Sequence, residues 1–197
     1  MFGFSKKIEK IKEPDWESAC TTLIEATLEA LKKFSLEYPE KPVSDICYDS
    51  EPSAGYVLIA FNTEANDIES FRKRNDESKH YARKQITERY DNWQDNAHSF
   101  LKSQVVRIRN GEPGYFDYQD FANVEFPEWV EYTEQDLPER PNYLDDYLET
   151  KVAYLFWKVF NNLVERDAFD ELSISKNFQL SYCFHDQSPV HLFVLNT

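Results

Sequence analysis

A wide apolar stripe along residues 144–163 constrains the fold more than any other feature of this sequence. Apolar side chains recur there at spacings of three and four, the period of one helical face: Leu144, Leu148, Val152, Leu155, Val159 and Leu163. Tyr147, Phe156 and Phe160 widen the stripe. A helix with so wide an apolar face is stable only when that face is packed against other elements, so the stripe predicts a helix that forms one wall of a hydrophobic core.

Two more helices are expected earlier in the chain. Residues 14–34 carry a second periodic stripe, which begins with Pro14 and Asp15, residues that suit a helix start, and stops before Pro39. A third helix is expected from residue 62 or 63 to about residue 90. Its apolar stripe is thin and its other positions are mostly charged, which predicts a helix on the surface with one edge in the core.

Four short segments predict two β-hairpins, because each pair is separated by turn-forming residues. The pairs are 43–49 with 55–61, and 178–184 with 190–195. Residues 56–61 are nearly all apolar, which indicates a central strand covered on both faces, and residues 104–109 alternate like a further strand. The order of elements predicts an α+β fold, with an antiparallel sheet built from hairpins and covered by three main helices.

Length, charge and cysteine content narrow the class of protein. The 197 residues suit one domain, with residues 1–13 expected to form a mobile N-terminal segment. Lys and Arg number 22 and Asp and Glu 36, so the formal net charge is −14, which argues against binding to nucleic acid or an anionic membrane. Three widely spaced cysteines and the lack of a signal-peptide pattern predict a cytoplasmic protein with reduced thiols.

Motifs for common chemistries are not found in the sequence. It contains four glycines and no phosphate-binding glycine loop, zinc-protease motif, EF-hand loop or nucleophile elbow, so we expect no cofactor. Two alternatives stay open. An enzyme could use an unrecognised carboxylate or Cys/His site, since Asp45 and Asp49 share a strand face. A metal or regulatory domain could use Cys183, His185 and His191, although no fourth ligand can be named.

An acidic stretch with aromatic neighbours is the best candidate for a binding surface. Carboxylates beside Trp and Tyr are typical of surfaces that capture a basic protein. The candidate partner-binding residues are Trp129, Glu131, Tyr132, Glu134, Asp136, Asp145 and Asp146. The simpler interpretation is a loop whose acids face water. Another is a homo-oligomeric structural domain, in which the aromatic residues of 115–129 form a self-interface.

The layout of the chain resembles the small bacterial immunity proteins of polymorphic-toxin and contact-dependent-inhibition systems, and related uncharacterised α+β domains. The residues that carry the resemblance are the helix 16–34, the hairpin segment 48–64, the segment 126–129 and the helix and hairpin from Leu144 onward. The resemblance implies a cytoplasmic, non-enzymatic protein that neutralises one cognate toxin, and it transfers no catalytic residue. The expected mechanism is occlusion of a basic active site by the acidic patch.

Overall fold

The structure is a computed structural model that describes residues 12–66, 69, 73, 113–134, 144–185 and 187–195. Most of the helix expected up to about residue 90, the strand expected at 104–109 and most of the N-terminal segment 1–13 lie outside these residues.

Two long helices, one short helix and a sheet make up most of the described fold, which confirms the α+β class. Residues 64–66, 69 and 73 are helical as well and lie in the helix expected from residue 62 or 63. The helices are α1 (Trp16–Glu37), α4 (Pro127–Thr133) and α5 (Leu144–Glu165). The strands are β1 (Val43–Glu51), β2 (Tyr56–Thr63), β3 (Tyr118–Glu125), β4 (Ile174–Phe184) and β5 (Val190–Leu195). Short 3-10 turns occupy Pro52–Ala54 and Pro113–Tyr115. Among the described helices, none combines the length and the apolar character that a membrane-spanning segment needs.

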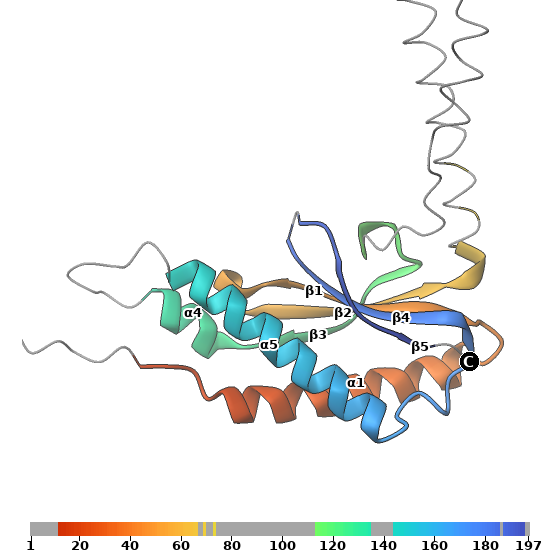
Figure 1. The fold of residues 1–197 in the computed structure, drawn as a ribbon, viewed down its shortest axis with the longest axis horizontal. Helices are drawn as coiled ribbons and strands as arrows, with labels where there is room; N and C mark the ends of the chain where they lie inside the picture. Colours follow the sequence, from red (N-terminus) through yellow and green to blue (C-terminus); the bar gives the residue numbers. More distant parts are fainter. Residues whose placement is uncertain are drawn as a thin grey trace, which may run out of the picture.

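The five-stranded sheet has the order β3-β2-β1-β4-β5 (Figure 1). Both predicted hairpins are confirmed, since β1 pairs with β2 and β4 pairs with β5 in antiparallel register. The sheet is nevertheless mixed and not purely antiparallel, because β4 lies parallel to β1. Parallel neighbouring strands need a long crossover connection, and the chain between β1 and β4, which includes α5, provides it. The central strand is β1, while the apolar strand β2 is interior but second from the edge.

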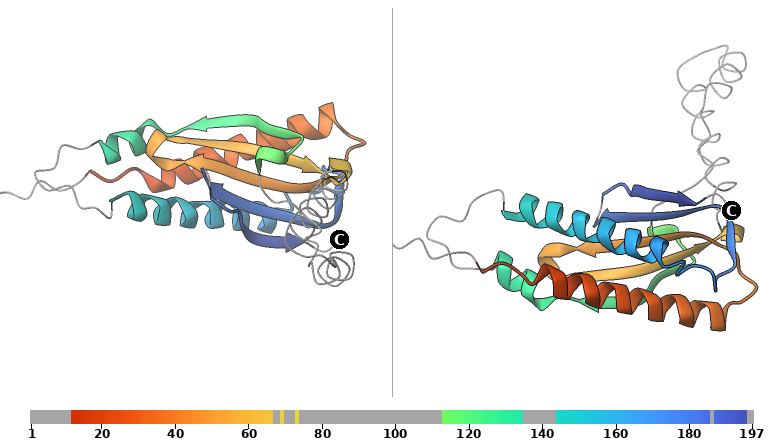
Figure 2. Two further views of the ribbon diagram at one scale, coloured as in Figure 1. Left: turned by 90° about the horizontal axis from the view of Figure 1, so that it is seen from above. Right: turned by 60° about the horizontal axis from the view of Figure 1, so that its bottom comes forward.

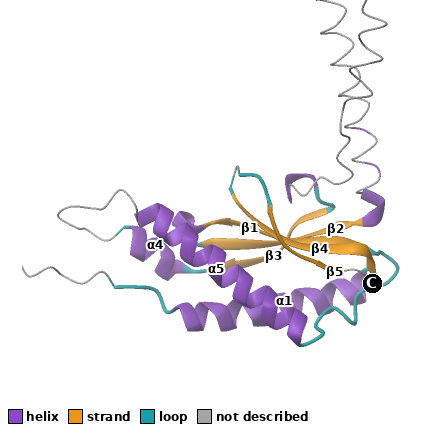
Figure 3. Ribbon diagram, viewed as in Figure 1, coloured by secondary structure: helices purple, strands orange, loops and turns teal. Residues whose placement is uncertain are grey.

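The helices α1 and α5 lie side by side over one face of the sheet (Figure 2). Figure 3 shows this helical layer in purple and the strands in orange. Asp15 is the N-cap of α1, because its side chain accepts a hydrogen bond from the Ser18 amide at 3.0 Å. Both helices begin at the end of the fold where α4 lies (Figure 1). This arrangement brings three helix-bearing segments from distant parts of the sequence to one end.

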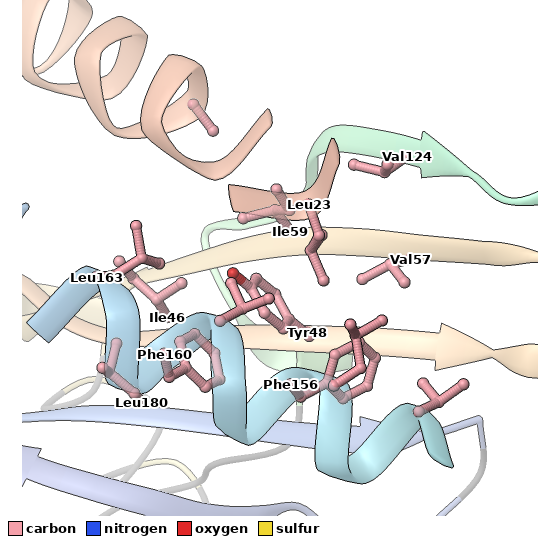
Figure 4. Close-up of a cluster of buried hydrophobic side chains, with 14 of the residues drawn as sticks. Leu23, Ile46, Tyr48, Val57, Ile59, Val124, Phe156, Phe160, Leu163 and Leu180 are labelled. Carbon is pink, nitrogen blue, oxygen red and sulfur yellow. The ribbon is translucent and has the colours of Figure 1, made fainter. Parts of the chain in front are cut away.

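The hydrophobic core lies between this helical layer and the sheet (Figure 4). Tyr48 of β1 stacks on Phe160 of α5 with ring centroids 4.3 Å apart, and Leu23 of α1 packs in the same cluster. The stripe of α5 that the sequence indicated is therefore a wall of the core. The buried residues Cys47, Ala60, Phe116 and Cys183 form a second, small apolar cluster.

The aromatic segment 115–129, which had no clear structural prediction, forms β3 and the start of α4. Its rings pack largely inward: Phe121 lies 5.4 Å from Phe34 by ring centroids, and Phe116, Phe126 and Trp129 are buried. Most of the rings proposed for a self-interface are thus occupied in the core.

Candidate functional site

The predicted site residues lie where the starts of α1 and α5 meet α4. Trp16 of α1 and Trp129 of α4 have ring centroids 6.2 Å apart. The Tyr147 hydroxyl of α5 donates a hydrogen bond to Glu13 Oε1 at 3.1 Å, just before α1. Lys12 Nζ lies 3.9 Å from Glu131 Oε2 of α4. These contacts join the three segments at one end of the molecule.

Trp129 and Tyr132 are both buried, with exposed fractions of 0% and 2%. The Trp129 ring stacks on Phe126 with centroids 4.2 Å apart. The short helix α4 turns these two rings toward the core, because a helix this small is held mainly by the tertiary packing of its apolar face. The prediction that the two rings are exposed anchors for a partner is therefore corrected, since neither is accessible on the folded surface.

The carboxylates predicted to bind a partner are in part exposed and in part outside the described residues. Glu131, Glu134 and Asp146 are exposed, and the Glu131 side chain keeps 71% of its accessible surface. Asp136 lies outside the described residues, and Asp145 belongs to α5 with a side chain that is not described. The exposed members remain available for a partner.

Further carboxylates join them from the start of α1, which the sequence interpretation assigned to the helix alone. Glu13 accepts hydrogen bonds from both Trp16 Nε1 and Tyr147 Oη, each at 3.1 Å. We call the combined surface the acidic end and define it by Glu13, Asp15, Glu17, Glu128, Glu131, Glu134 and Asp146. No local sequence signal predicts this grouping, because it depends on how three distant segments pack.

Three lysines lie beside the acidic end and reduce its charge only in part. Lys158 Nζ lies 3.0 Å from Glu17 Oε1, and this hydrogen bond raises the pKa of Lys158. Lys151 lies over the Tyr147 ring, and its hydrogen bond to Tyr147 raises its pKa. Lys158 and Lys151 therefore stay charged. Among the residues that the structure describes at this end, the seven carboxylates outnumber the three lysines, so this part of the surface is net negative.

An exposed aromatic pair lies on α5 next to this surface. Tyr154 and Trp157 keep 59% and 44% of their accessible surface, and their rings stack with centroids 5.7 Å apart. The sequence interpretation missed this pair, although a signal existed: both positions fall outside the apolar stripe of α5 on a helical projection. Large exposed aromatic side chains are typical anchors of protein interfaces.

The Cys/His group considered as a metal site does not converge. Cys183 is buried and its thiol lies 3.5 Å from Asp49 Oδ1, as a donor to that carboxylate. The neighbouring Cys47, burial and Asp49 raise the pKa of Cys183, which disfavours the reactive thiolate. His185 and His191 are exposed. Within the part of the chain that the structure describes, no three His, Cys, Asp or Glu side chains are placed to hold a metal ion.

Asp45 and Asp49 share one face of β1, as predicted. Asp45 is buried with an exposed fraction of 1%, and the Ser44 hydroxyl donates to its Oδ2 at 2.7 Å. Asp49 is half-buried and accepts from Cys183. These contacts give both carboxylates a structural role in the sheet.

Comparisons of the chain with protein-family models, curated proteins and solved structures find no match.

Proposed function

We propose that this chain is an immunity- or antitoxin-like protein that binds a cognate basic toxin and neutralises it by occlusion, without catalysis. The observation that carries the proposal is the acidic end, where α1, α4 and α5 contribute carboxylates to one surface. A protein that acts on nucleic acid must present cations to phosphates. Carboxylates arranged on a rigid helical surface can form ion pairs with those cationic side chains and so keep the nucleic acid out of the toxin's active site.

The electrostatics of the acidic end favour fast capture of such a partner. Most of its carboxylates are exposed, so each ion pair with a partner adds little affinity by itself. Together they create a negative field that accelerates association and favours basic partners over acidic ones. The exposed rings of Tyr154 and Trp157 supply apolar contact area beside that field, in the role first assigned to Trp129 and Tyr132.

Co-production with the products of adjacent reading frames tests the proposal. We expect one of those products to arrest growth when produced alone and to be harmless together with this chain. The two purified proteins should form a stoichiometric complex. Arrest that persists despite equal amounts of this chain, or protection that needs only trace amounts of it, would contradict neutralisation by occlusion.

Charge-reversed variants connect the activity to the acidic end. Glu131→Lys combined with Glu134→Lys should weaken protection from growth arrest. The matched control is Glu25→Lys combined with Glu29→Lys, because these residues are exposed on α1 away from the acidic end. Equal protection by both double variants would remove the acidic end from the mechanism.

A further inference from the structure

A groove runs between α5 and the turn of the β4–β5 hairpin, at the edge of the acidic end. It is an open groove with a volume of about 410 Å³, within the roughly 300–1,000 Å³ typical of ligand pockets. Its apolar part is formed by Ala153, Tyr182, Phe184 and Val190, and its charged part by Asp146 and Glu149. A groove that combines aromatic rings with carboxylates suits a cation that has an apolar stem.

The aromatic part of the groove is held in place by the core. The rings of Tyr182 and Phe184 lie edge to face with centroids 5.4 Å apart. Both contact the buried ring of Phe156, at centroid distances of 5.5 and 6.4 Å. Burial raises the pKa of Tyr182, so its ring remains a neutral phenol. Neutral aromatic faces attract cations through their quadrupole, most strongly where water is partly excluded.

The two carboxylates are neighbours on one helix. Asp146 and Glu149 are three residues apart on α5, so their side chains lie on adjacent turns of the same face. The positive end of the helix accounts for acids in this turn, but it does not account for their position beside two fixed aromatic rings. A cation bound here would face carboxylates on one side and aromatic rings on the other.

We propose that this groove binds one arginine side chain of the basic partner, with the stem against Ala153 and Val190 and the guanidinium between the aromatic rings and the two carboxylates. Arginine is favoured over lysine because its planar guanidinium stacks on rings and makes paired hydrogen bonds to carboxylates. Trp157 lies four residues beyond Ala153, on the next turn of α5, and extends the contact surface. The inference rests on the proposed function only in requiring a basic partner.

Titration of the isolated chain with a blocked arginine tests the groove without the partner. N-acetyl-arginine-N-methylamide is added to the ¹⁵N-labelled protein, and backbone amide shifts are followed by NMR. We expect saturable shifts at Thr150, Ala153, Phe184 and Val190. The blocked citrulline, which has nearly the same shape but no charge, should bind at least tenfold more weakly, since the charge-assisted hydrogen bonds are lost.

Variants of the two groove carboxylates test whether they bind the arginine. Asp146→Asn combined with Glu149→Gln should lower the affinity for the blocked arginine about tenfold, whereas Glu25→Gln combined with Glu29→Gln should leave it unchanged. Shifts that do not saturate, equal binding of citrulline, or equal binding of blocked lysine would overturn the proposal. If the complex with the toxin is unchanged by Asp146→Asn with Glu149→Gln, the arginine site in the groove is overturned, but the proposed function is not. If the groove binds blocked arginine but the chain has no basic protein partner, the proposed function is overturned, but the arginine site is not.

Discussion

The hydroxyl groups of Thr27 and Tyr48 lie 2.7 Å apart in the core between α1 and β1. The Thr27 hydroxyl donates its single hydrogen to the Leu23 carbonyl at 2.6 Å. The hydrogen between the two hydroxyls therefore belongs to Tyr48, which donates to Thr27. Since both side chains are fully buried, water cannot replace either partner.

The direction of this hydrogen bond predicts unequal effects of removing its two partners. Tyr48→Phe removes the donor and should lower the free energy of unfolding by about 1 kcal/mol. Thr27→Val leaves the Tyr48 hydroxyl buried without its acceptor and should cost more, roughly 1–3 kcal/mol. Urea denaturation of the two variants and of the double variant measures these costs. A larger loss for Tyr48→Phe than for Thr27→Val would contradict the assigned direction.

Tyr48 also predicts a loss of stability at alkaline pH. Its burial raises the pKa of the phenol above its ordinary value, and the hydrogen bond with Thr27 offsets this only in part. Below about pH 10, both the folded and the unfolded chain keep the proton. Above that pH the unfolded chain releases it and the folded chain retains it. The free energy of unfolding therefore falls as pH rises, by at most about 1.4 kcal/mol per pH unit from this group.

Replacing the phenol isolates its share of this alkaline loss. Tyr48→Phe should decrease the slope of the free energy of unfolding against pH above about pH 10. Tyr154→Phe removes an exposed phenol from α5 and is the matched control. Urea denaturation at a series of alkaline pH values gives both slopes, and equal slopes for the two variants would contradict the role of Tyr48.

Local periodicity explains which parts of the fold the sequence could predict. The stripe of α5 and the two hairpins depend on spacing within a short segment, and the structure confirms them. The parallel pairing of β1 with β4 depends on the path of the chain between them, which periodicity does not encode. The strand β3 was missed because its register shift against β2 breaks the alternation on which strand prediction depends.

In the candidate site, too, the sequence predicts local properties but not contacts between distant segments. The carboxylates Glu131 and Glu134 could be predicted as exposed, because charged side chains are rarely buried. The burial of Trp129 could not be predicted, since it depends on packing against Phe126 and the distant Trp16. The contribution of Glu13 likewise follows from its contact with Tyr147 across the fold.

Gly55 is expected to be intolerant of a side chain. It has a φ of +71°, and an added Cβ would lie 2.7 Å from both Phe126 O and Val130 Cγ2. Its carbonyl also accepts a hydrogen bond from the Phe126 amide at 2.7 Å, which attaches the start of α4 to the β1–β2 turn. Gly55→Ala should therefore lower the free energy of unfolding by roughly 1–3 kcal/mol.

Gly114→Ala provides the control for Gly55→Ala, because nothing lies within 4 Å of the added Cβ at Gly114. Its effect on the free energy of unfolding should stay within about 0.5 kcal/mol. Thermal and urea unfolding of both variants measure the difference. Similar stability of the two variants would show that α4 tolerates displacement from the turn.

The exposed ring of Trp157 is expected to contribute to binding and little to stability. Trp157→Ala should weaken the complex with the basic partner about tenfold or more, as truncation of an interface anchor does. Leu36→Ala is the control, because Leu36 is 72% exposed on α1. Calorimetric titration gives the affinities, and urea denaturation verifies the folding of both variants. An unchanged affinity for Trp157→Ala would exclude this ring from the interface.

Reversal of charge at the acidic end should act mainly on the rate of association. Glu131→Lys with Glu134→Lys replaces two exposed anions by cations, so we expect association with a basic partner to slow about tenfold at low salt. The difference from wild type should shrink as salt shortens the screening length from about 10 Å at 0.1 M to about 3 Å at 1 M. Stopped-flow association at several salt concentrations measures this dependence. Dissociation should change less than association, because exposed ion pairs contribute little to the affinity of the bound state. A rate that is equally slow at all salt concentrations would indicate a loss of direct contacts or of folding, and would contradict steering by these carboxylates.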